Sequence, residues 1–363
     1  MNINLGTKGI NKIAVFGFLF GLVSILIRIL VPADLIQTAY TEGLYPFLRS
    51  GLDRVHAFFG IHLFWPLLIT LILILSYSVF RIIRVENPPQ KKLLKIGLGT
   101  VAFLIGMAGI FLWLWGYNYG KKSFYENIGL EPIDLSIEEM KGMVADQIQL
   151  LDSLHEFRNS NPDYELAELG KHEFFKPQLK EVLFDIGMNH PGNPEPVAMR
   201  PKGFLLRLGT AGFYNPFTGE SNVDPGLHPL QIPFVTVHEL SHAYGITHEG
   251  ACNFLAVLVG RSVQDPGLRY PFELTYYRYL MGQLRSMDLK AYEMLRKEVP
   301  EQVREDLAAI RLNGQNYPDL FPKLRDLIYG SYLKSQGQTE GLGSYNKVVN
   351  MVAAWDKKSL LEN

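Results

Sequence analysis

One stretch of the sequence has residue types and spacing that suit metal chemistry, namely HELSHAYGITHEGACN from His238 to Asn253. Residues four apart share one face of a helix, so His238 and His242 can both point an imidazole at one metal ion. Glu239 lies about 100° around the same turn, where its carboxylate can reach a water on that ion and act as general base. Two histidines and a glutamate in this order are typical of zinc hydrolases.

The residues around this motif predict a helix. Pro233 suits a first helical position because it has no N–H to leave unpaired, and Phe234, Val237 and Leu240 supply apolar contacts. Gly245 can adopt the left-handed conformation that ends a helix. The same five-residue pattern also occurs by chance in helices whose histidines are surface or hydrogen-bonded core residues. The helical context favours the metal site.

Catalytic zinc usually takes three protein ligands, and two interpretations of the third stay open. The stretch HELSHAYGITH matches the metzincin pattern HExxHxxGxxH, which makes His248 a candidate. Glu249 is the other candidate, because Glu249 and Asn253 have the Glu-x-x-x-Asn spacing of gluzincins, in which the later residue supports the ligands from behind.

Two features favour Glu249 over His248. Metzincins need a methionine turn under the metal, whereas Met281, Met287 and Met294 all lie in helical patterns. The residues from Glu249 to about residue 263 read as a second helix, antiparallel to the first, with Glu249 in its opening turn. His248 stays as the alternative ligand.

Composition limits the class of protein. The chain has 363 residues, 47% of them hydrophobic, and a formal net charge of -1, so it can hold a membrane part and a soluble domain. Near-neutral charge argues against nucleic acid as a partner. Cys252 is the single cysteine, which excludes an internal disulfide and a cysteine-rich metal site, and we expect it to be a small buried side chain.

The N-terminal third is expected to be a membrane anchor. Three apolar runs, near residues 13–31, 58–80 and 94–115, each approach the ~20 residues needed to cross a bilayer core. Tryptophan and tyrosine gather at their ends, as they do at membrane interfaces. The sequence therefore predicts a mainly α protein with a transmembrane anchor over residues 1–120 and a largely helical zincin-like domain over residues 121–363.

Basic residues predict the orientation. Short loops rich in lysine and arginine stay in the cytoplasm. Such residues precede the first span and crowd the link between the second and third: Lys8, Lys12, Arg81, Arg84, Lys91, Lys92 and Lys95. The N-terminus is then cytoplasmic and, after an odd number of spans, the C-terminal domain is extracytoplasmic. The first span lacks a small-residue cleavage site and is expected to be retained as an anchor.

Between the third span and the metal motif, the sequence predicts two helices and an extended region. Ser136 and Glu139 form a capping box that opens a long amphipathic helix, and a shorter helix follows near residues 171–187. The apolar FLLRLG is a possible strand. The turn-rich segment Tyr214–Val223 is the expected substrate-binding wall, with Tyr214, Glu220 and Asn222 as candidate contacts.

Downstream of the motif, the pattern predicts helices and few other elements. Their expected bounds are 272–287, 288–298, 300–312, 320–335 and 345–357. A tyrosine hydroxyl from these helices could stabilise an oxyanion. The sequence does not choose among Tyr276, Tyr277, Tyr332 and Tyr345.

Most of the chain resembles an uncharacterised family of bacterial inner-membrane proteins with three N-terminal spans and an HExxH domain. The resemblance rests on YTEGLYPFLRSGLDRV, LWGYNYGKKSF, GFYNPFTGESNV, PFVTVHELSHAYGITHEGACNFLA and YLKSQGQTEGLGSYNKVV, in this order. In that family the site looks like HExxHxxG followed by Glu-x-Glu-Ala-Asn. Glu249 and Asn253 match its first Glu and its Asn, whereas Ala251 replaces the second Glu and His248 stands at a usually basic position. The resemblance implies a zincin-like metalloenzyme of the bacterial inner membrane.

Together these features predict a membrane-anchored zinc metallohydrolase that cleaves proteins or peptides in the cell envelope. One zinc ion on His238, His242 and Glu249 would polarise a peptide carbonyl, and Glu239 would move the proton. The alternative is a non-hydrolytic envelope scaffold, sensor or chaperone whose domain the zinc stabilises.

Overall fold

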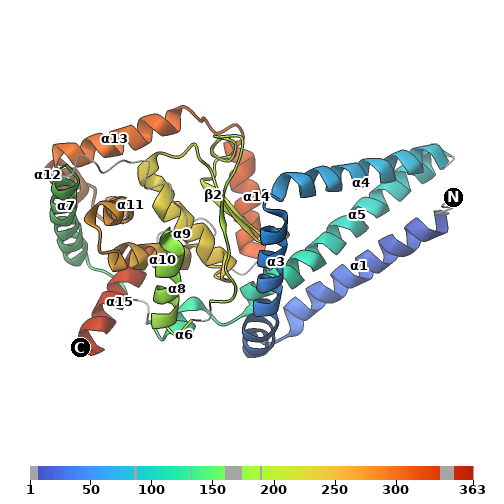
Figure 1. The fold of residues 1–363 in the computed structure, drawn as a ribbon, viewed down its shortest axis with the longest axis horizontal. Helices are drawn as coiled ribbons and strands as arrows, with labels where there is room; N and C mark the ends of the chain where they lie inside the picture. The colour runs from blue at the N-terminus through green and yellow to red at the C-terminus, as the bar shows by residue number, and fades with distance from the viewer. Residues whose placement is uncertain are drawn as a thin grey trace. The chain divides into compact units, whose positions relative to one another are not determined.

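A computed structural model describes residues 7–85, 88–131, 133–159, 174–188, 190–335 and 347–362. The chain is mainly helical, as expected, with one small three-stranded sheet (Figure 1). It divides into two compact units. The N-terminal unit is Met1–Lys122 together with Asn215–Glu220, and the C-terminal unit is Ser123–Tyr214 together with Ser221–Asn363.

Helices make up the N-terminal unit. Their bounds are α1 (Thr7–Leu30), α2 (Ala33–Leu35), the π-helix η1 (Ile36–Leu44), α3 (Tyr45–Phe59), α4 (Phe64–Val85), α5 (Pro89–Leu114) and the 3₁₀-helix η2 (Gly116–Gly120). Among the described residues, three helices are long and apolar enough to cross a membrane: Lys12–Leu30, Phe64–Arg84 and Pro89–Leu114. The prediction of three helices that are long and apolar enough to cross a membrane is confirmed.

The predicted start of the second span was wrong. It was placed at residue 58, but Phe58 and Phe59 are the last residues of α3. Gly60 follows with φ 59°, a left-handed conformation that ends α3, and α4 begins at Phe64. An apolar run does not reveal this break, because the residues on both sides of the glycine are equally apolar.

Glycines let α1 and α5 pack backbone to backbone. A Cβ added to Gly21 would lie 2.0 Å from the carbonyl oxygen of Ile105, and one added to Gly109 would lie 2.8 Å from the Cα of Gly21. A Cβ on Gly106 would meet the carbonyl oxygen of Gly17 at 3.2 Å. Small residues at such contacts are a common basis of helix association in membranes.

A buried arginine and a buried glutamate connect α3 and α4 to the turn 215–220. Arg49 of α3 is 1% exposed, pairs with Asp53, and donates to the carbonyl oxygen of Gly219 at 2.9 Å. Glu220, also 1% exposed, accepts from the backbone N–H of Leu63 at 2.6 Å and from the hydroxyl of Thr218 at 2.8 Å. These bonds make the turn part of the N-terminal unit.

The C-terminal unit is built mainly from helices and contains the small sheet. The elements up to the sheet are α6 (Phe124–Ile128), α7 (Ile137–Asn159), α8 (Phe175–Asp185), β1 (Pro196–Ala198), η5 (Leu206–Leu208), β2 (Gly212–Asn215) and β3 (Glu220–Val223). The later ones are η6 (Pro229–Gln231), α9 (Ile232–Ala243), α10 (Glu249–Ser262), α11 (Pro266–Met287), α12 (Leu289–Glu298), α13 (Glu301–Gln315), α14 (Pro322–Ser335) and α15 (Val348–Glu362). Residues 171–173 and 345–346 of two predicted helices lie outside the described residues.

Capping explains where two of these helices begin. The predicted capping box of α7 is present, because Ser136 N donates to the Glu139 carboxylate at 2.8 Å and Glu139 N donates to the Ser136 hydroxyl at 3.3 Å. The predicted start of α11 at residue 272 was wrong. Asp265 accepts from the N–H groups of Gly267 and Leu268 and starts α11 at Pro266.

The strand order in the sheet is β1-β3-β2, and β1 runs parallel to β3 with Val197 opposite Asn222. The possible strand at FLLRLG was wrong. The carboxylate of Asp224, just after β3, accepts from the N–H groups of Gly203, Leu205 and Leu206, at 2.7, 2.8 and 3.1 Å, and this holds the segment in turns that end in η5.

Helix α10 lies at the centre of the core of this unit, with α8, α9, α11 and α15 against it (Figure 1). Every residue of α10 from Glu249 to Gly260 is buried. Gly260 allows the close approach of α11, since a Cβ there would lie 2.3 Å from the Cβ of Phe272. The functional residues on α9 and α10 are thus held by packing on several sides.

Candidate metal centre

The candidate metal centre lies where α9 ends and α10 begins. Pro233 is in the first turn of α9, and Gly245 follows the helix with φ 86°. The N–H of Ile246 bonds back to the carbonyl of Ser241 at 3.2 Å, which closes the turn after the helix. The chain then re-enters a helix at Glu249, so the opening turn of α10 faces the histidines of α9.

Three side-chain atoms converge there. His238 Nε2 and His242 Nε2 are 3.2 Å apart. Glu249 Oε2 lies 3.1 Å from His238 Nε2 and 3.5 Å from His242 Nε2. The three atoms form a nearly equilateral triangle, and this donor set could hold a divalent ion.

The opposite side of each imidazole has its own acceptor. His238 Nδ1 lies 2.8 Å from the side-chain oxygen of Asn253, and His242 Nδ1 lies 2.7 Å from the carbonyl oxygen of Ile246. These acceptors favour the tautomer with the proton on Nδ1, which leaves both Nε2 lone pairs directed at the same point. Asn253 and Ile246 therefore orient the rings for a shared ligand.

Cys252 also lies close to the two histidines, as a possible alternative third donor. Its Sγ is 3.4 Å from His242 Nδ1 and 3.8 Å from the carbonyl oxygen of Ile246. The sulfur is thus on the Nδ1 side of that ring, whereas Glu249 Oε2 is at the Nε2 atoms of both rings. Burial raises the pKa of the Cys252 thiol, which favours its protonated form. Glu249 is the better third donor.

The carboxylate of Glu249 is the charged member of the triangle. Burial raises its pKa, but attraction to His242 and hydrogen bonds with both histidines outweigh burial and hold the pKa well below its usual range. Glu249 is therefore ionised while His242 carries a proton, and a bound divalent ion would supply the positive charge in place of that proton.

Glu239 is a buried carboxylate next to this triangle. Burial raises its pKa to about 7, although the charges of His238 and His242 and a hydrogen bond from the Tyr214 backbone oppose the rise. Among the described residues, its Oε2 has no hydrogen-bond partner. A carboxylate that titrates near neutrality can both accept and release a proton.

Strand β2 lies against Glu239. A Cβ added to Gly212 would be 2.8 Å from both Cγ and Oε1 of Glu239, so only glycine leaves room for this carboxylate. The Ser221 hydroxyl of β3 donates to the backbone oxygen of Glu239 at 3.0 Å. The sheet and α9 thus fix the position of the carboxylate together.

A comparison with known protein families matches residues 40–353 to a protein family of unknown function, DUF3810. The chain belongs to the DUF3810 family. No curated protein matches the chain. No solved structure matches it either.

In this DUF3810 chain, the core of the sequence-predicted site comes together. His238, His242 and Glu249 meet at the triangle, Asn253 stands behind His238, and Glu239 is their neighbour. His248 has another contact in the structure. Its Nδ1 accepts from the N–H of Ala251 at 3.1 Å and caps α10.

The predicted substrate contacts fall in different places. Tyr214 meets Glu239 through its backbone. Asn222 is fully buried in β3. Glu220 belongs to the N-terminal unit, where His56 Nδ1 and His62 Nε2 lie 3.5 and 3.8 Å from its carboxylate oxygens.

The sequence-based reasoning missed several residues of the site in this family member. Gly212 and the backbone carbonyl of Ile246 contribute no side chain that a sequence motif could identify as part of a metal site. Cys252 was expected only to be a small buried side chain. Burial raises the pKa of Tyr279 of α11 to about 12, and the negative charge of Glu249 adds to this rise. The phenol is therefore protonated at neutral pH and can donate a hydrogen bond. A pattern of tyrosines along a helix could not single out Tyr279, because packing decides which tyrosine lies against α9, where the ring centroids of Tyr279 and Phe234 are 6.1 Å apart.

Proposed function

We propose that His238, His242 and Glu249 hold one zinc ion and that the chain is a membrane-anchored zinc metallohydrolase acting on protein or peptide substrates in the cell envelope. The observation that carries the proposal is the triangle of two Nε2 atoms and one carboxylate oxygen, with sides of 3.1, 3.2 and 3.5 Å. Tetrahedral zinc with bonds of about 2.0–2.1 Å has ligand atoms about 3.3 Å apart. The donor set therefore fits zinc in size and in chemistry.

The remaining groups supply orientation and proton transfer. When bound, zinc supplies a Lewis acid that polarises a carbonyl and acidifies water. Glu239 accepts a proton at its unpartnered Oε2 and delivers it to the leaving amine. Asn253 and Ile246 hold the two imidazoles so that their Nε2 lone pairs converge.

The position of β2 supports a peptide as substrate. Strand β2 is at the edge of the sheet order, and the N–H of its Tyr214 reaches Glu239. An extended peptide can add to such an edge by main-chain hydrogen bonds, which would bring a peptide carbonyl next to the carboxylate that moves the proton.

One observation favours the alternative of a non-hydrolytic zinc-stabilised domain. His238, His242 and Glu249 are only 9%, 8% and 4% exposed, and structural zinc sites are closed to solvent. In that case the ion would stabilise the junction of α9 and α10, and the chain would act as an envelope scaffold, sensor or chaperone.

Replacement of Glu239 by glutamine separates the two functions. The variant removes the titrating carboxylate and keeps its shape, so the hydrolase proposal predicts unchanged zinc content and loss of turnover by about 10²–10⁴-fold. Full-length protein in detergent is assayed against a peptide library, with Glu305→Gln on the exposed face of α13 as a control of equal charge change. Hydrolysis that is equal in both variants contradicts the role of Glu239.

We also propose an orientation in the bacterial inner membrane, with a cytoplasmic N-terminus and an extracytoplasmic C-terminal unit. It rests on the basic residues in the first turns of α1 and at the adjoining ends of α4 and α5. Alkaline phosphatase fused after residue 363 should be active, because that reporter works only outside the cytoplasm. Activity of a fusion in the link after α4, with none at the C-terminus, contradicts the orientation.

A further inference from the structure

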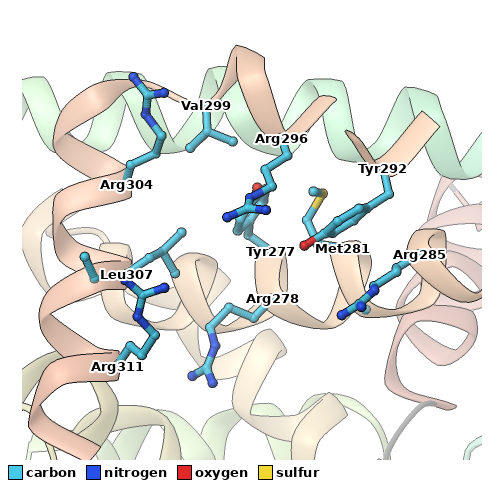
Figure 2. A pocket seen from close by; sticks show the side chains of 12 residues that line it. Tyr277, Arg278, Met281, Arg285, Tyr292, Arg296, Val299, Arg304, Leu307 and Arg311 are labelled. Carbon is cyan, nitrogen blue, oxygen red and sulfur yellow. The ribbon is translucent and has the colours of Figure 1, made fainter. Parts of the chain in front are cut away.

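A second candidate site lies among α11, α12 and α13 of the C-terminal unit, where a cavity of about 410 Å³ is lined by arginines (Figure 2). The five arginines are Arg278, Arg285, Arg296, Arg304 and Arg311. All five are exposed residues, so their guanidinium groups are accessible from solvent. The cavity is open to a ligand from outside.

The spacing of the arginines spreads charge along the cavity. Arg278 and Arg285 are seven residues apart on α11, as are Arg304 and Arg311 on α13. Seven residues are about two helical turns, or about 10 Å, so each pair shares one face of its helix. Figure 2 shows Arg296 of α12 reaching into the space beside Tyr277.

The floor of the cavity is apolar and aromatic. Tyr277, Met281 and Val299 line it and are 4%, 6% and 3% exposed. The ring of Tyr292 lies 5.6 Å from the guanidinium carbon of Arg285. Burial raises the pKa of Tyr277 to about 12, so its phenol does not contribute a negative charge at neutral pH.

Within the described residues, the lining of the cavity holds five basic side chains. None of the described lining residues is acidic. The ion pairs among described residues, such as Arg261 with Asp356 and Arg269 with Glu273, involve other arginines. Five like charges around one cavity repel one another unless an anion joins them, and guanidinium groups bind phosphate oxygens in bidentate geometry.

We propose that this cavity among α11, α12 and α13 binds a phosphate-bearing ligand with more than one anionic oxygen. Phosphate suits the site because its several oxygens can accept from two or more arginines at once. The apolar floor leaves room for a non-polar portion of the ligand next to the phosphate. The site is independent of the metal centre and of any hydrolytic activity.

The test is calorimetric titration of the full-length protein in a non-ionic detergent. One arm uses inorganic pyrophosphate, and the other uses the soluble phospholipid dihexanoyl-phosphatidylglycerol, with dihexanoyl-phosphatidylcholine, whose phosphate is balanced by its cationic choline group, as the net-neutral comparison. Arg278→Gln with Arg296→Gln removes two charges from the cavity. Lys290→Gln with Lys297→Gln removes two exposed charges from α12 that do not line it.

Saturable binding of either phosphate probe is expected, and the double arginine variant should bind at least about tenfold more weakly while the double lysine variant binds normally. Binding of pyrophosphate alone assigns the site to a soluble ligand, and binding of the phosphatidylglycerol alone assigns it to a lipid headgroup. Both support the proposal. The arginine variant should keep the melting temperature of the native protein without ligand, because it relieves repulsion. Three results would overturn the proposal. They are no binding of either phosphate probe, an equal loss of binding in the arginine and lysine variants, and binding of polyglutamate, a carboxylate polyanion, without binding of either phosphate probe.

Discussion

At the scale of single residues, the candidate metal centre is shaped as much by the groups behind the histidines as by the histidines. An imidazole can rotate about its side chain, so two neighbouring histidines converge only if each Nδ1 has a fixed acceptor. Asn253 supplies one acceptor from α10, and the carbonyl of Ile246 supplies the other from the turn after α9. The turn and the second helix are thus parts of the site.

Replacement of Asn253 by alanine should weaken zinc binding about 10–100-fold, because His238 loses the acceptor that fixes its tautomer and its orientation. Competition with a chelating dye measures the affinity. Asn313→Ala is the matched control, since Asn313 donates to the carbonyl of Gly226 at 2.8 Å and belongs to no metal ligand set. Equal affinities in the two variants would show that Asn253 does not orient His238.

Replacement of Gly212 by alanine should displace either β2 or Glu239. The new Cβ would lie 2.6 Å from the carbonyl oxygen of Asn222 and 2.8 Å from Oε1 of Glu239. Stability should fall by about 1–3 kcal/mol, and hydrolysis of a peptide substrate should fall by about 10²-fold. Gly142→Ala on α7 is the control, since no atom lies within 4 Å of its added Cβ. A Gly212→Ala protein with native melting temperature and turnover counts against the contact.

The site residues that could be predicted from the sequence are those that lie close to one another along the chain. His238, His242, Glu249 and Asn253 lie within one stretch. Helical spacing pairs the two histidines on α9, and the turn at Gly245 brings α10 back to them. Gly212 contacts Glu239 from β2, which no spacing rule connects to α9. Glu220 was misplaced for the same reason, because the turn that contains it belongs to the N-terminal unit.

At the scale of elements, helix association in the N-terminal unit depends on glycines. Gly21 on α1 and Gly109 on α5 lie where an added Cβ would come within 3.0 Å of the other helix, at 2.0 and 2.8 Å. Such close packing is one of the sources of attraction between helices in a membrane, together with hydrogen bonds between them.

Replacement of Gly21 by isoleucine should separate α1 from α5, because the added Cβ would lie 2.0 Å from the carbonyl oxygen of Ile105 and backbone cannot yield as a side chain can. We expect the melting temperature of the full-length protein in detergent to fall, by a loss of at least about 2 kcal/mol. Gly97→Ile on α5 adds the same apolar group where nothing lies within 4 Å. If both variants melt alike, the glycine contact does not hold the helices together.

Elements with a local signal were predictable, and those fixed by distant partners were not. The capping box of Ser136 and Glu139 predicted α7, and apolar runs predicted the three long apolar helices of the N-terminal unit. The segment before β2 reads as a strand by hydrophobicity. Asp224, well beyond it in sequence, binds its N–H groups and folds it into turns instead.

At the scale of the whole molecule, two units can be described separately, and one short segment departs from the order of the chain. The turn 215–220 lies between β2 and β3 in sequence but belongs to the N-terminal unit through Arg49 and Leu63. The expected division at residue 120 is close to the division after Lys122. Residues 215–220 belong to the N-terminal unit because of the contacts of the buried Arg49 and Glu220. A domain boundary predicted from amino-acid composition does not detect such contacts.

The central claim is that two imidazoles and one carboxylate share a zinc ion. X-ray absorption at the zinc edge of the purified full-length protein tests it most directly. We expect one zinc per chain with nitrogen and oxygen ligands at about 2.0–2.1 Å, including two imidazoles, and no sulfur at about 2.3 Å. A sulfur ligand would assign the site to Cys252 in place of Glu249. Protein that retains no zinc after purification at neutral pH in zinc-supplemented buffer would contradict the metal centre itself.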